Sequence, residues 1–235
     1  MSDFSRLAAR CEAIVVFDTE TSGLSFSRDE IIEFAAVRLE RGPEGFAVAA
    51  EADEFVRMTN DRRLPQRIVE LTGITDELLR EEGIGKAQFA GLLASFLRPN
   101  TLLAAYNAQF DLLFLYEFLA KYGDARLLRG LPKLDLLTVY RDRRAYPHRL
   151  ANAIEQYALA GHVRNSHRAI DDVRATVEVM RAMEKERDDL DRYVDLFGYS
   201  AKYGVSGPRI GSVTYLPQGY EPDGLLYEKC AGATV

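Results

Sequence analysis

The sequence predicts an α/β fold in which a mixed sheet is covered by helices. The N-terminal quarter of the chain contains successive apolar, β-branched segments separated by turn residues, which is typical of an antiparallel meander. A further short apolar segment runs directly into a strongly helical stretch, and most of the sequence beyond it has helical periodicity. This order of strands and helices indicates an α/β architecture.

The first expected strand covers residues 13–18, whose sequence AIVVFD is apolar and β-branched and ends in polar residues. Residues 30–39 and 46–58 are the second and third expected strands, separated by the Gly-Pro-Glu-Gly turn of residues 42–45. Residues 101–106 form a fourth short strand that is buried. The first three strands therefore form the meander, and the fourth leads into a helix.

Helical periodicity, interrupted by glycine and proline, accounts for most of the remaining sequence. The stretch 109–122 is the most apolar of these segments, and glycine follows it as a helix-ending residue. The helices we expect are 65–71, one beginning near 75–77, 86–97, 109–122, 134–144, 150–160 and 170–187.

The character of the chain changes after residue 187. Residues 188–195 are highly charged, and the residues that follow are rich in Gly, Pro and Tyr and have no helical period. We therefore expect one domain over residues 1–187 and an extended tail over 188–235 that wraps the domain or reaches a partner.

Composition narrows the class of protein only modestly. The 235 residues carry a net charge of −6, whereas a generic nucleic-acid-binding surface is usually basic. Clustered carboxylates that bind metal would themselves lower the charge, so a nucleic-acid substrate is not excluded. No apolar run is long enough to cross a bilayer, and no secretion signal precedes residue 18. We expect a cytoplasmic protein in which Cys11 and Cys230 are free thiols.

Acidic residues stand at the edges of the expected elements. Asp18 and Glu20 follow the first strand, and residues two apart in an extended segment point to the same side, so both carboxylates can enter one pocket. Asp111 opens an otherwise apolar helix, where an acid can also serve only to complement the helix dipole. His167 precedes the last long helix, whose first turn offers two carboxylates, at 171 and 172, only one of which can face the same site.

Together these segments resemble, in order and spacing, the three motifs of the DEDDh (DnaQ-like) 3′→5′ exonuclease family, which includes the proofreading epsilon subunit of bacterial DNA polymerase III. Residues 17–23 (FDTETSG) resemble the first motif, D-x-E in a context like FDTETTG, and depart from it only at Ser22. Residues 107–111 (NAQFD) match N-x-x-F-D, and residues 167–172 (HRAIDD) match H-x-A-x-x-D. The third motif selects Asp172 rather than its neighbour as the metal-binding carboxylate.

The resemblance implies a ribonuclease-H-like fold with a five-stranded mixed sheet. It also implies two divalent ions, Mg²⁺ or a substituting Mn²⁺, in a site that cuts phosphodiester bonds. By this resemblance Asp18 contacts both ions, Glu20 and Asp172 complete one site, and Asp111 holds the other. His167 acts as the general base that accepts a proton from the attacking water.

The implied substrate is a single-stranded or frayed 3′ end of DNA or RNA, with DNA favoured and nucleoside monophosphates as products. RNA 3′-end processing and a non-catalytic scaffold that binds nucleic acid or a polymerase are the alternatives. A glycosidase built on a carboxylate pair would leave the His-x-Ala-x-x-Asp pattern unexplained.

Substrate contacts are expected from the residues around the motifs. Leu24 and Phe26 follow the first motif and either stack on terminal bases or anchor their own loop. Arg164 and Arg168 flank the expected base and can contact phosphates, although a solvated face is the alternative. Asn107 positions the second motif or contacts the substrate. The substrate-binding residues we expect are Thr21, Leu24, Phe26, Asn107, Phe110, Arg164 and Arg168.

The tail offers one hint of a partner. Asp195-Leu196-Phe197 resembles the end of a bacterial sliding-clamp-binding motif, but the usual preceding Gln is absent. A packing segment is the alternative. A DNA polymerase or a sliding clamp is therefore the expected class of protein partner, and no membrane partner is expected.

Overall fold

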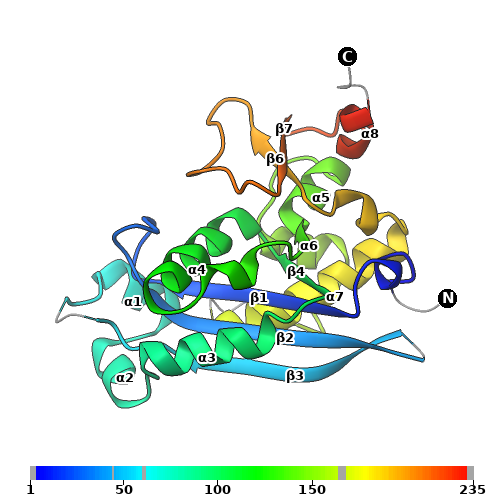
Figure 1. Ribbon diagram of the computed structural model, residues 1–235. Coiled ribbons are helices and arrows are strands. Elements are labelled where there is room, and N and C mark those ends of the chain that lie inside the picture. The colour runs from blue at the N-terminus through cyan, green and yellow to red at the C-terminus, as the bar shows by residue number, and fades with distance from the viewer. Residues whose placement is uncertain (1–3, 44, 60–61, 164–167, 232–235) are drawn as a thin grey trace.

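The computed structural model describes residues 4–43, 45–59, 62–163 and 168–231 (Figure 1). At its centre is a mixed five-stranded sheet with the strand order β3-β2-β1-β4-β5. The strands β1, β2 and β3 pair antiparallel, whereas β4 and β5 join parallel to β1 and β4. The predicted α/β fold with three antiparallel strands is therefore confirmed. The strand bounds are β1 Ala13–Thr21, β2 Ile31–Gly42, β3 Gly45–Phe55, β4 Thr101–Ala105 and β5 Lys133–Asp135.

Helices cover both faces of this sheet (Figure 1). Their bounds are α1 Gln66–Thr72, α2 Asp76–Glu81, α3 Lys86–Phe96, α4 Ala108–Tyr122, α5 Leu136–Arg143, α6 Leu150–Gln156, α7 Ala169–Glu186 and α8 Leu226–Ala231. Single 3-10 turns lie at Leu7–Ala9, Ala125–Leu128 and Leu190–Tyr193. Within the described ranges, none of these helices combines the length and the apolar composition that a membrane span requires.

The alternation of side chains along β1 divides the core into two parts. Val15 and Phe17 pack with side chains of α3 and α4 on one face. Ile14 and Val16 pack with α5, α6 and α7 on the other face. Because side chains alternate along a strand, residues 18 and 20 point to the same face as Ile14 and Val16. Residue 19 points to the opposite face, with Val15 and Phe17. The end of β1 thus presents side chains to α7 and to α4 in turn.

One element was predicted wrongly. Residues 134 and 135, expected to begin a helix, belong to β5, and α5 begins only at Leu136. The Asp135 side chain accepts hydrogen bonds from the backbone N–H groups of Leu137 and Thr138, both at 3.2 Å, and so caps α5. A strand of three residues is too short to show a periodicity of its own. The prediction therefore merged it with the helix that follows.

The segment after residue 187 contains regular structure that the sequence did not predict. The strands β6 Leu196–Ser200 and β7 Thr214–Gln218 form a separate parallel pair, and α8 follows. We call residues 188–231 the C-terminal segment. Leu196 and Phe197, the apolar part of the expected clamp motif, are only 4% and 1% exposed. Their side chains pack in the core, so the packing interpretation of this motif is correct.

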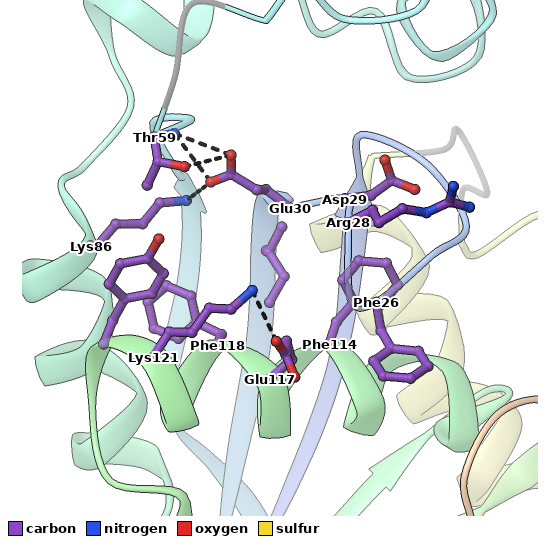
Figure 2. A pocket seen from close by; sticks show the side chains of 12 residues that line it. Phe26, Arg28, Asp29, Glu30, Thr59, Lys86, Phe114, Glu117, Phe118 and Lys121 are labelled. Carbon is purple, nitrogen blue, oxygen red and sulfur yellow. Dashed lines mark hydrogen bonds and ion pairs between the residues drawn. The ribbon is translucent and has the colours of Figure 1, made fainter.

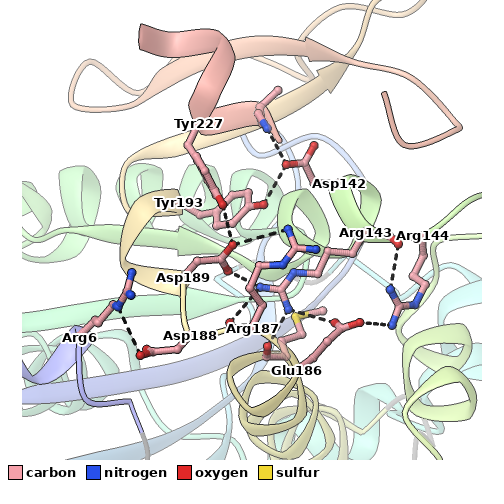
Figure 3. Close-up of polar contacts among 12 residues, drawn as sticks. Arg6, Asp142, Arg143, Arg144, Glu186, Arg187, Asp188, Asp189, Tyr193 and Tyr227 are labelled. Carbon is pink, nitrogen blue, oxygen red and sulfur yellow. Dashed lines mark hydrogen bonds and ion pairs between the residues drawn. The ribbon is translucent and has the colours of Figure 1, made fainter. Parts of the chain in front are cut away.

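A buried polar network joins the C-terminal segment to α5 (Figure 3). The Arg143 guanidinium, which is fully buried, forms an ion pair with Asp189. The Tyr227 hydroxyl donates to Asp189 at 2.8 Å, and the Tyr193 hydroxyl donates to Asp142 at 2.9 Å. Asp142 also accepts the backbone N–H at the start of α8. These contacts fix the C-terminal segment against the helical layer.

Candidate active site

Three carboxylates converge where β1 ends beside the start of α7. Asp18 and Glu20 both point to the α7 face of the sheet because they lie two residues apart on β1. Asp172 projects from the first turn of α7. One oxygen atom from each of the three side chains lies within 4.8 Å of the others. The structure thus brings together three of the four predicted metal-binding residues in one group.

The fourth predicted ligand, Asp111, approaches from the α4 face. It lies in the first turn of α4 and is 3% exposed. Its Oδ1 atom accepts hydrogen bonds from the backbone N–H and the hydroxyl of Thr19, at 3.0 and 2.6 Å. Thr19 points toward α4 because its parity is opposite to that of Asp18 and Glu20. Asp111 therefore borders the group of three without belonging to it.

Glu33 on β2 orients the start of α7 and was missed by the sequence analysis. Its carboxylate is fully buried and lies opposite Glu20 in the β1–β2 register. It accepts the backbone N–H of Ala169 at 3.0 Å and two N–H groups of Arg168 at 2.8 and 2.7 Å. Glu33 is thus the cap of the helix that carries Asp172. The signal in the sequence was an acid inside the apolar run IIEFAAV.

Burial and mutual repulsion raise the pKa values of the clustered carboxylates. Removal from water is the largest cause for Asp18, Glu20 and Asp111. It acts with the charges of Asp111, Glu20 and Asp172 to raise the pKa of Asp18 well above its usual range. The pKa of Glu20 rises to about 8 and that of Asp111 to about 7. A divalent cation would remove this repulsion, and hard carboxylate oxygens are the ligands that Mg²⁺ prefers, so the donor set fits such an ion.

Asp135 on the neighbouring strand β5 stabilises the turn between β4 and α4. Asn107 has a positive φ of 72°, which lets the chain turn sharply from strand to helix. The backbone N–H groups of Asn107 and Ala108 donate to Asp135 Oδ1 at 3.0 and 3.1 Å. The side chain of Asn107 is exposed at this turn. Asp135, a second residue that the sequence analysis missed, thereby positions the helix that carries Asp111.

The residues expected to contact substrate lie in different surroundings. Thr21 is buried, and its hydroxyl donates to the Gly23 carbonyl at 2.6 Å within the turn after β1. Leu24 is 78% exposed at the tip of that loop. Phe110 is partly buried and packs on Phe114 with ring centroids 5.0 Å apart. Phe26, also partly buried, lies between Leu24 and the face of α4.

The basic residues expected near the third motif are only partly described. Arg168 forms its ion pair with Glu33, and its guanidinium lies 4.9 Å from the Phe55 ring centroid. The structure thus gives Arg168 a structural partner, and its contact with a phosphate stays a prediction. Arg164 and His167 lie outside the described residues. The described neighbours of His167 are fixed by Glu33, because Arg168 and Ala169 are both its hydrogen-bond donors.

Comparison with known proteins gives a consistent assignment. A family model described as Exonuclease matches residues 15–180. The DNA polymerase III PolC-type protein of Clostridium perfringens is 32% identical over 184 residues, covering 75% of this chain and 12% of the relative. The DNA polymerase III subunit epsilon of Treponema pallidum is 31% identical over 175 residues, covering 73% of this chain and 76% of the relative.

A solved structure agrees at the level of the fold. Escherichia coli exonuclease I in complex with a dT13 oligonucleotide superposes with a TM-score of 0.68 at 24% identity, covering 77% of this chain and 43% of the other. The chain thus spans only a small part of its PolC-type relatives but most of the length of the epsilon subunit. With the sheet, the carboxylate group and the family match in agreement, the chain belongs to the exonuclease family.

Proposed function

We propose that this protein is a metal-dependent 3′→5′ exonuclease that removes nucleotides from DNA. The observation that carries the proposal is the convergence of Asp18, Glu20 and Asp172 within 4.8 Å, in a chain of the exonuclease family. Buried carboxylates that repel one another destabilise a fold unless a cation compensates them. The convergence of these carboxylates at the end of the central strand β1 therefore supports a site that binds metal.

The residues that would hold the ions are the three converging carboxylates, with Asp111 serving the second ion. Two divalent ions held there would supply charge stabilisation to the attacking and leaving oxygens of a phosphodiester. Thr19 would keep Asp111 in one orientation through its two hydrogen bonds. Glu33 would hold the start of α7 and thereby the placement of Asp172.

The proposed reaction is hydrolysis of the last phosphodiester bond. A water oxygen attacks the phosphorus, the bond from phosphorus to the 3′ oxygen breaks, and a proton is delivered to that oxygen. The products are a nucleoside 5′-monophosphate and a strand shortened by one nucleotide. His167 would accept the proton of the attacking water, a task for which an imidazole with a pKa near neutrality is suited.

DNA is the favoured substrate because the relatives are DNA polymerase III polypeptides and the solved structure with the same fold contains a dT13 oligonucleotide. RNA is the alternative substrate that the experiment must separate. We would incubate 5′-labelled single-stranded DNA, mismatched duplex DNA and RNA with Mg²⁺ or Mn²⁺. Progressive shortening from the 3′ end is expected, fastest on single-stranded DNA, while a faster reaction on RNA would reassign the substrate.

Adjacent acids on α7 supply a matched control. Asp172→Asn should abolish the shortening, whereas Asp171→Asn, which removes the same charge one position earlier, should retain it. Equal loss in both variants would show that the effect is not specific to the carboxylate group. No hydrolysis by the unaltered protein on any substrate would favour the non-catalytic scaffold.

The proposed base has its own test. His167→Ala should lower kcat by about 10²–10⁴-fold, the usual scale for a general base. The thermal shift produced by Mg²⁺ should be retained because the carboxylates are untouched. Full activity in this variant would remove His167 from the mechanism.

A further inference from the structure

A hollow of about 430 Å³ lies between the loop after β1 and the start of α4, and its volume is within the range of roughly 300–1,000 Å³ that is common for ligand sites. One side is the loop 24–29 that follows the first motif, and another is the start of α4 at Phe110 and Leu113. The hollow is thus built from the same two elements that carry Asp18 and Asp111, the end of β1 with its loop and the first turn of α4. Its remaining side comes from Ser206 and Gly207 in the loop between β6 and β7. We call it the 206–207 hollow.

Aromatic rings and arginines line this hollow. Phe26, Phe110 and Phe114 contribute rings, and Arg28 and Arg67 contribute guanidinium groups. Among the described residues, neither arginine has an acidic ion-pair partner, and Arg67 is exposed. Rings on which bases stack, beside cations that follow phosphates, are the chemistry by which proteins hold single-stranded nucleic acid.

A neighbouring hollow of about 170 Å³ shows the contrast (Figure 2). It shares Phe26, Arg28, Asp29 and Phe114 with the first, but its two lysines already have acidic partners. Lys86 lies 2.7 Å from a Glu30 oxygen and Lys121 lies 2.9 Å from a Glu117 oxygen. Arg28 lines both hollows, whereas Arg67, the cation that distinguishes the 206–207 hollow, is found only there.

Gln109, a residue of the second motif, holds the loop between β6 and β7 in place. The Gln109 side-chain amide donates to the carbonyls of Ser206 and Pro208 at 3.0 and 2.9 Å. Its oxygen accepts from the Tyr215 hydroxyl at 2.6 Å, and that hydroxyl accepts from the backbone N–H of Ile210 at 3.0 Å. Four hydrogen bonds thus connect α4 to the loop through two side chains. Gln109 is 9% exposed, so its amide serves the loop rather than solvent.

The loop also approaches α4 too closely for a side chain. Gly207 has φ of +79°, and a Cβ atom there would lie 2.6 Å from Leu113 Cδ1 and 3.4 Å from a Phe26 ring carbon. The positive φ and the close approach to Leu113 both favour glycine at this position. Gln109 and Tyr215 thus hold this loop against α4, while the buried Arg143 network holds the C-terminal segment to α5.

We propose that Ser206 and Gly207, held by Gln109 and Tyr215, complete a subsite that binds the nucleotide on the 5′ side of the bond being cut. This inference rests on the proposed exonuclease function. The base of that nucleotide stacks on Phe26 or Phe110, and Arg67 contacts its phosphate. A base stacked there is unpaired, so the C-terminal segment adds a preference for unpaired 3′ ends. Ser206, Gly207 and Tyr215 lie beyond the part of the chain that matches the family model.

Two substrates separate this subsite from the metal site. The p-nitrophenyl ester of thymidine 5′-monophosphate contains the terminal nucleotide alone, whereas a 5′-labelled oligothymidylate also carries the nucleotide on the 5′ side. Tyr215→Phe removes the hydroxyl that joins Gln109 to Ile210. We expect it to raise KM for the oligonucleotide about fivefold, the equivalent of one hydrogen bond of about 1 kcal/mol, and to leave ester hydrolysis unchanged. Tyr203→Phe, which removes an exposed hydroxyl in the same segment, is the matched control.

A surface charge gives a second variant that does not depend on loop packing. Arg67→Gln should raise KM for the oligonucleotide by about tenfold at low salt, and less as salt rises, because screening weakens the phosphate contact. Arg63→Gln makes the same change at an arginine outside the hollow and should have no comparable effect.

The outcomes distinguish this inference from the function on which it rests. If Tyr215→Phe and Arg67→Gln match their controls on the oligonucleotide, the subsite is overturned and the exonuclease stands. Equal losses on the ester and the oligonucleotide would also overturn it, since the ester does not reach the hollow. If the unaltered protein hydrolyses neither substrate, the proposed function fails and this inference fails with it.

Discussion

The two ends of α7 both meet buried charged side chains, but the charges are balanced differently at each end. At its start, Asp172 lies with Asp18 and Glu20, and the nearby Arg168 forms its ion pair with Glu33. At its end, the Arg143 guanidinium donates to the Met183 carbonyl at 2.6 Å and pairs with Asp189 and Glu186. A cation at the end of a helix also complements the helix dipole.

The start of α7 gathers like charges that the proposed cation would compensate. At the end of α7, the buried cation Arg143 already has acidic partners from the protein. Buried charges are tolerated when opposite charges and hydrogen bonds surround them, as they do at Arg143. At the start of α7 three carboxylates converge instead, and burial together with the charges of Asp172 and Glu33 raises the pKa of Glu20 to about 8. A raised carboxyl pKa alone does not distinguish the two ends, since that of Glu184 at the end of α7 also rises to about 8 through burial and the neighbouring Asp188. The convergence of three carboxylates is what distinguishes the start of the helix, and the proposed cation would compensate it.

The largest expected effect comes from removing one charge at the unbalanced end. Asp18→Asn should lower the rate of DNA hydrolysis by roughly 10⁴-fold or more, about 5.5 kcal/mol of transition-state stabilisation. The same variant should melt at a higher temperature than the unaltered protein without metal, because it removes a buried repulsion. Calorimetry measures the melting temperature, and a gel assay on the same preparation measures the rate of DNA hydrolysis. A loss of activity accompanied by a lower melting temperature would indicate misfolding instead, and Asp53→Asn on exposed β3 is the control.

Removing the buried cation at the end of α7 should lower the free energy of unfolding but leave the rate of hydrolysis unchanged. Arg143→Met removes the shorter of the two ion pairs of buried Asp189 and leaves only Arg187 at 3.8 Å, and breaking a buried ion pair costs about 3–5 kcal/mol. Urea unfolding of the full chain measures the free energy of unfolding. Arg144→Gln, at the half-exposed neighbour that pairs with Glu186, should cost no more than about 1 kcal/mol. Similar costs for the two variants would contradict the assignment of the Arg143 network as the anchor.

Glu33→Gln tests the positioning of α7 at the unbalanced end. The amide keeps the size of the side chain but loses the charge that holds Arg168 and the Ala169 N–H. We expect kcat to fall by about 10–100-fold and Mn²⁺ to bind more weakly, as when partners of metal ligands are changed. Glu40→Gln, which removes an exposed partner of Arg38 on the same strand, is the matched control. Unchanged kcat with unchanged Mn²⁺ affinity would leave Glu33 with a purely structural role.

The smallest expected effect is the dependence of stability on pH. The pKa values of Glu20 and Asp111 rise to about 8 and about 7, above those of an unfolded chain. Groups whose pKa is raised by folding contribute stability at low pH and lose it as pH rises through the folded value. Without metal, the melting temperature should therefore fall as the pH rises from about 5 to about 8. The same pH series on Asp18→Asn serves as the reference for groups that titrate elsewhere in the protein. Mg²⁺ at about 100 times its Kd adds about 2.7 kcal/mol, or about 5–10 °C, and its shift should be larger at pH 8 than at pH 6.

Local patterns predicted the part of the site that depends on local geometry. The spacing of Asp18 and Glu20 sufficed because strand parity alone sends both to one side. Glu33 was missed because its role depends on the register between β1 and β2 and on the contact with α7. Neither can be read from the residues around it. Asp111 was identified from its motif, but its separation from the other three carboxylates follows from its bonds to Thr19.

The C-terminal segment was predicted least well, for a similar reason. Its strands β6 and β7 are short, and the connection between them is rich in glycine. Its stability comes from partners far away in the sequence, such as Arg143 for Asp189 and Asp142 for Tyr193. Hydrophobic periodicity carries no information about such pairs. The predicted division of the chain at residue 187 stays a prediction.

The register pair of Glu20 and Glu33 makes metal binding a checkpoint for folding. A slip of one residue between β1 and β2 would turn Asp18 and Glu20 toward α4 and Thr19 toward α7. The capping of α7 and the hydrogen bonds of Asp111 would be lost in the same step. A chain in the wrong register would then have no group of carboxylates for an ion to recognise. Metal ions should therefore select correctly paired strands during refolding, in addition to any part they take in catalysis.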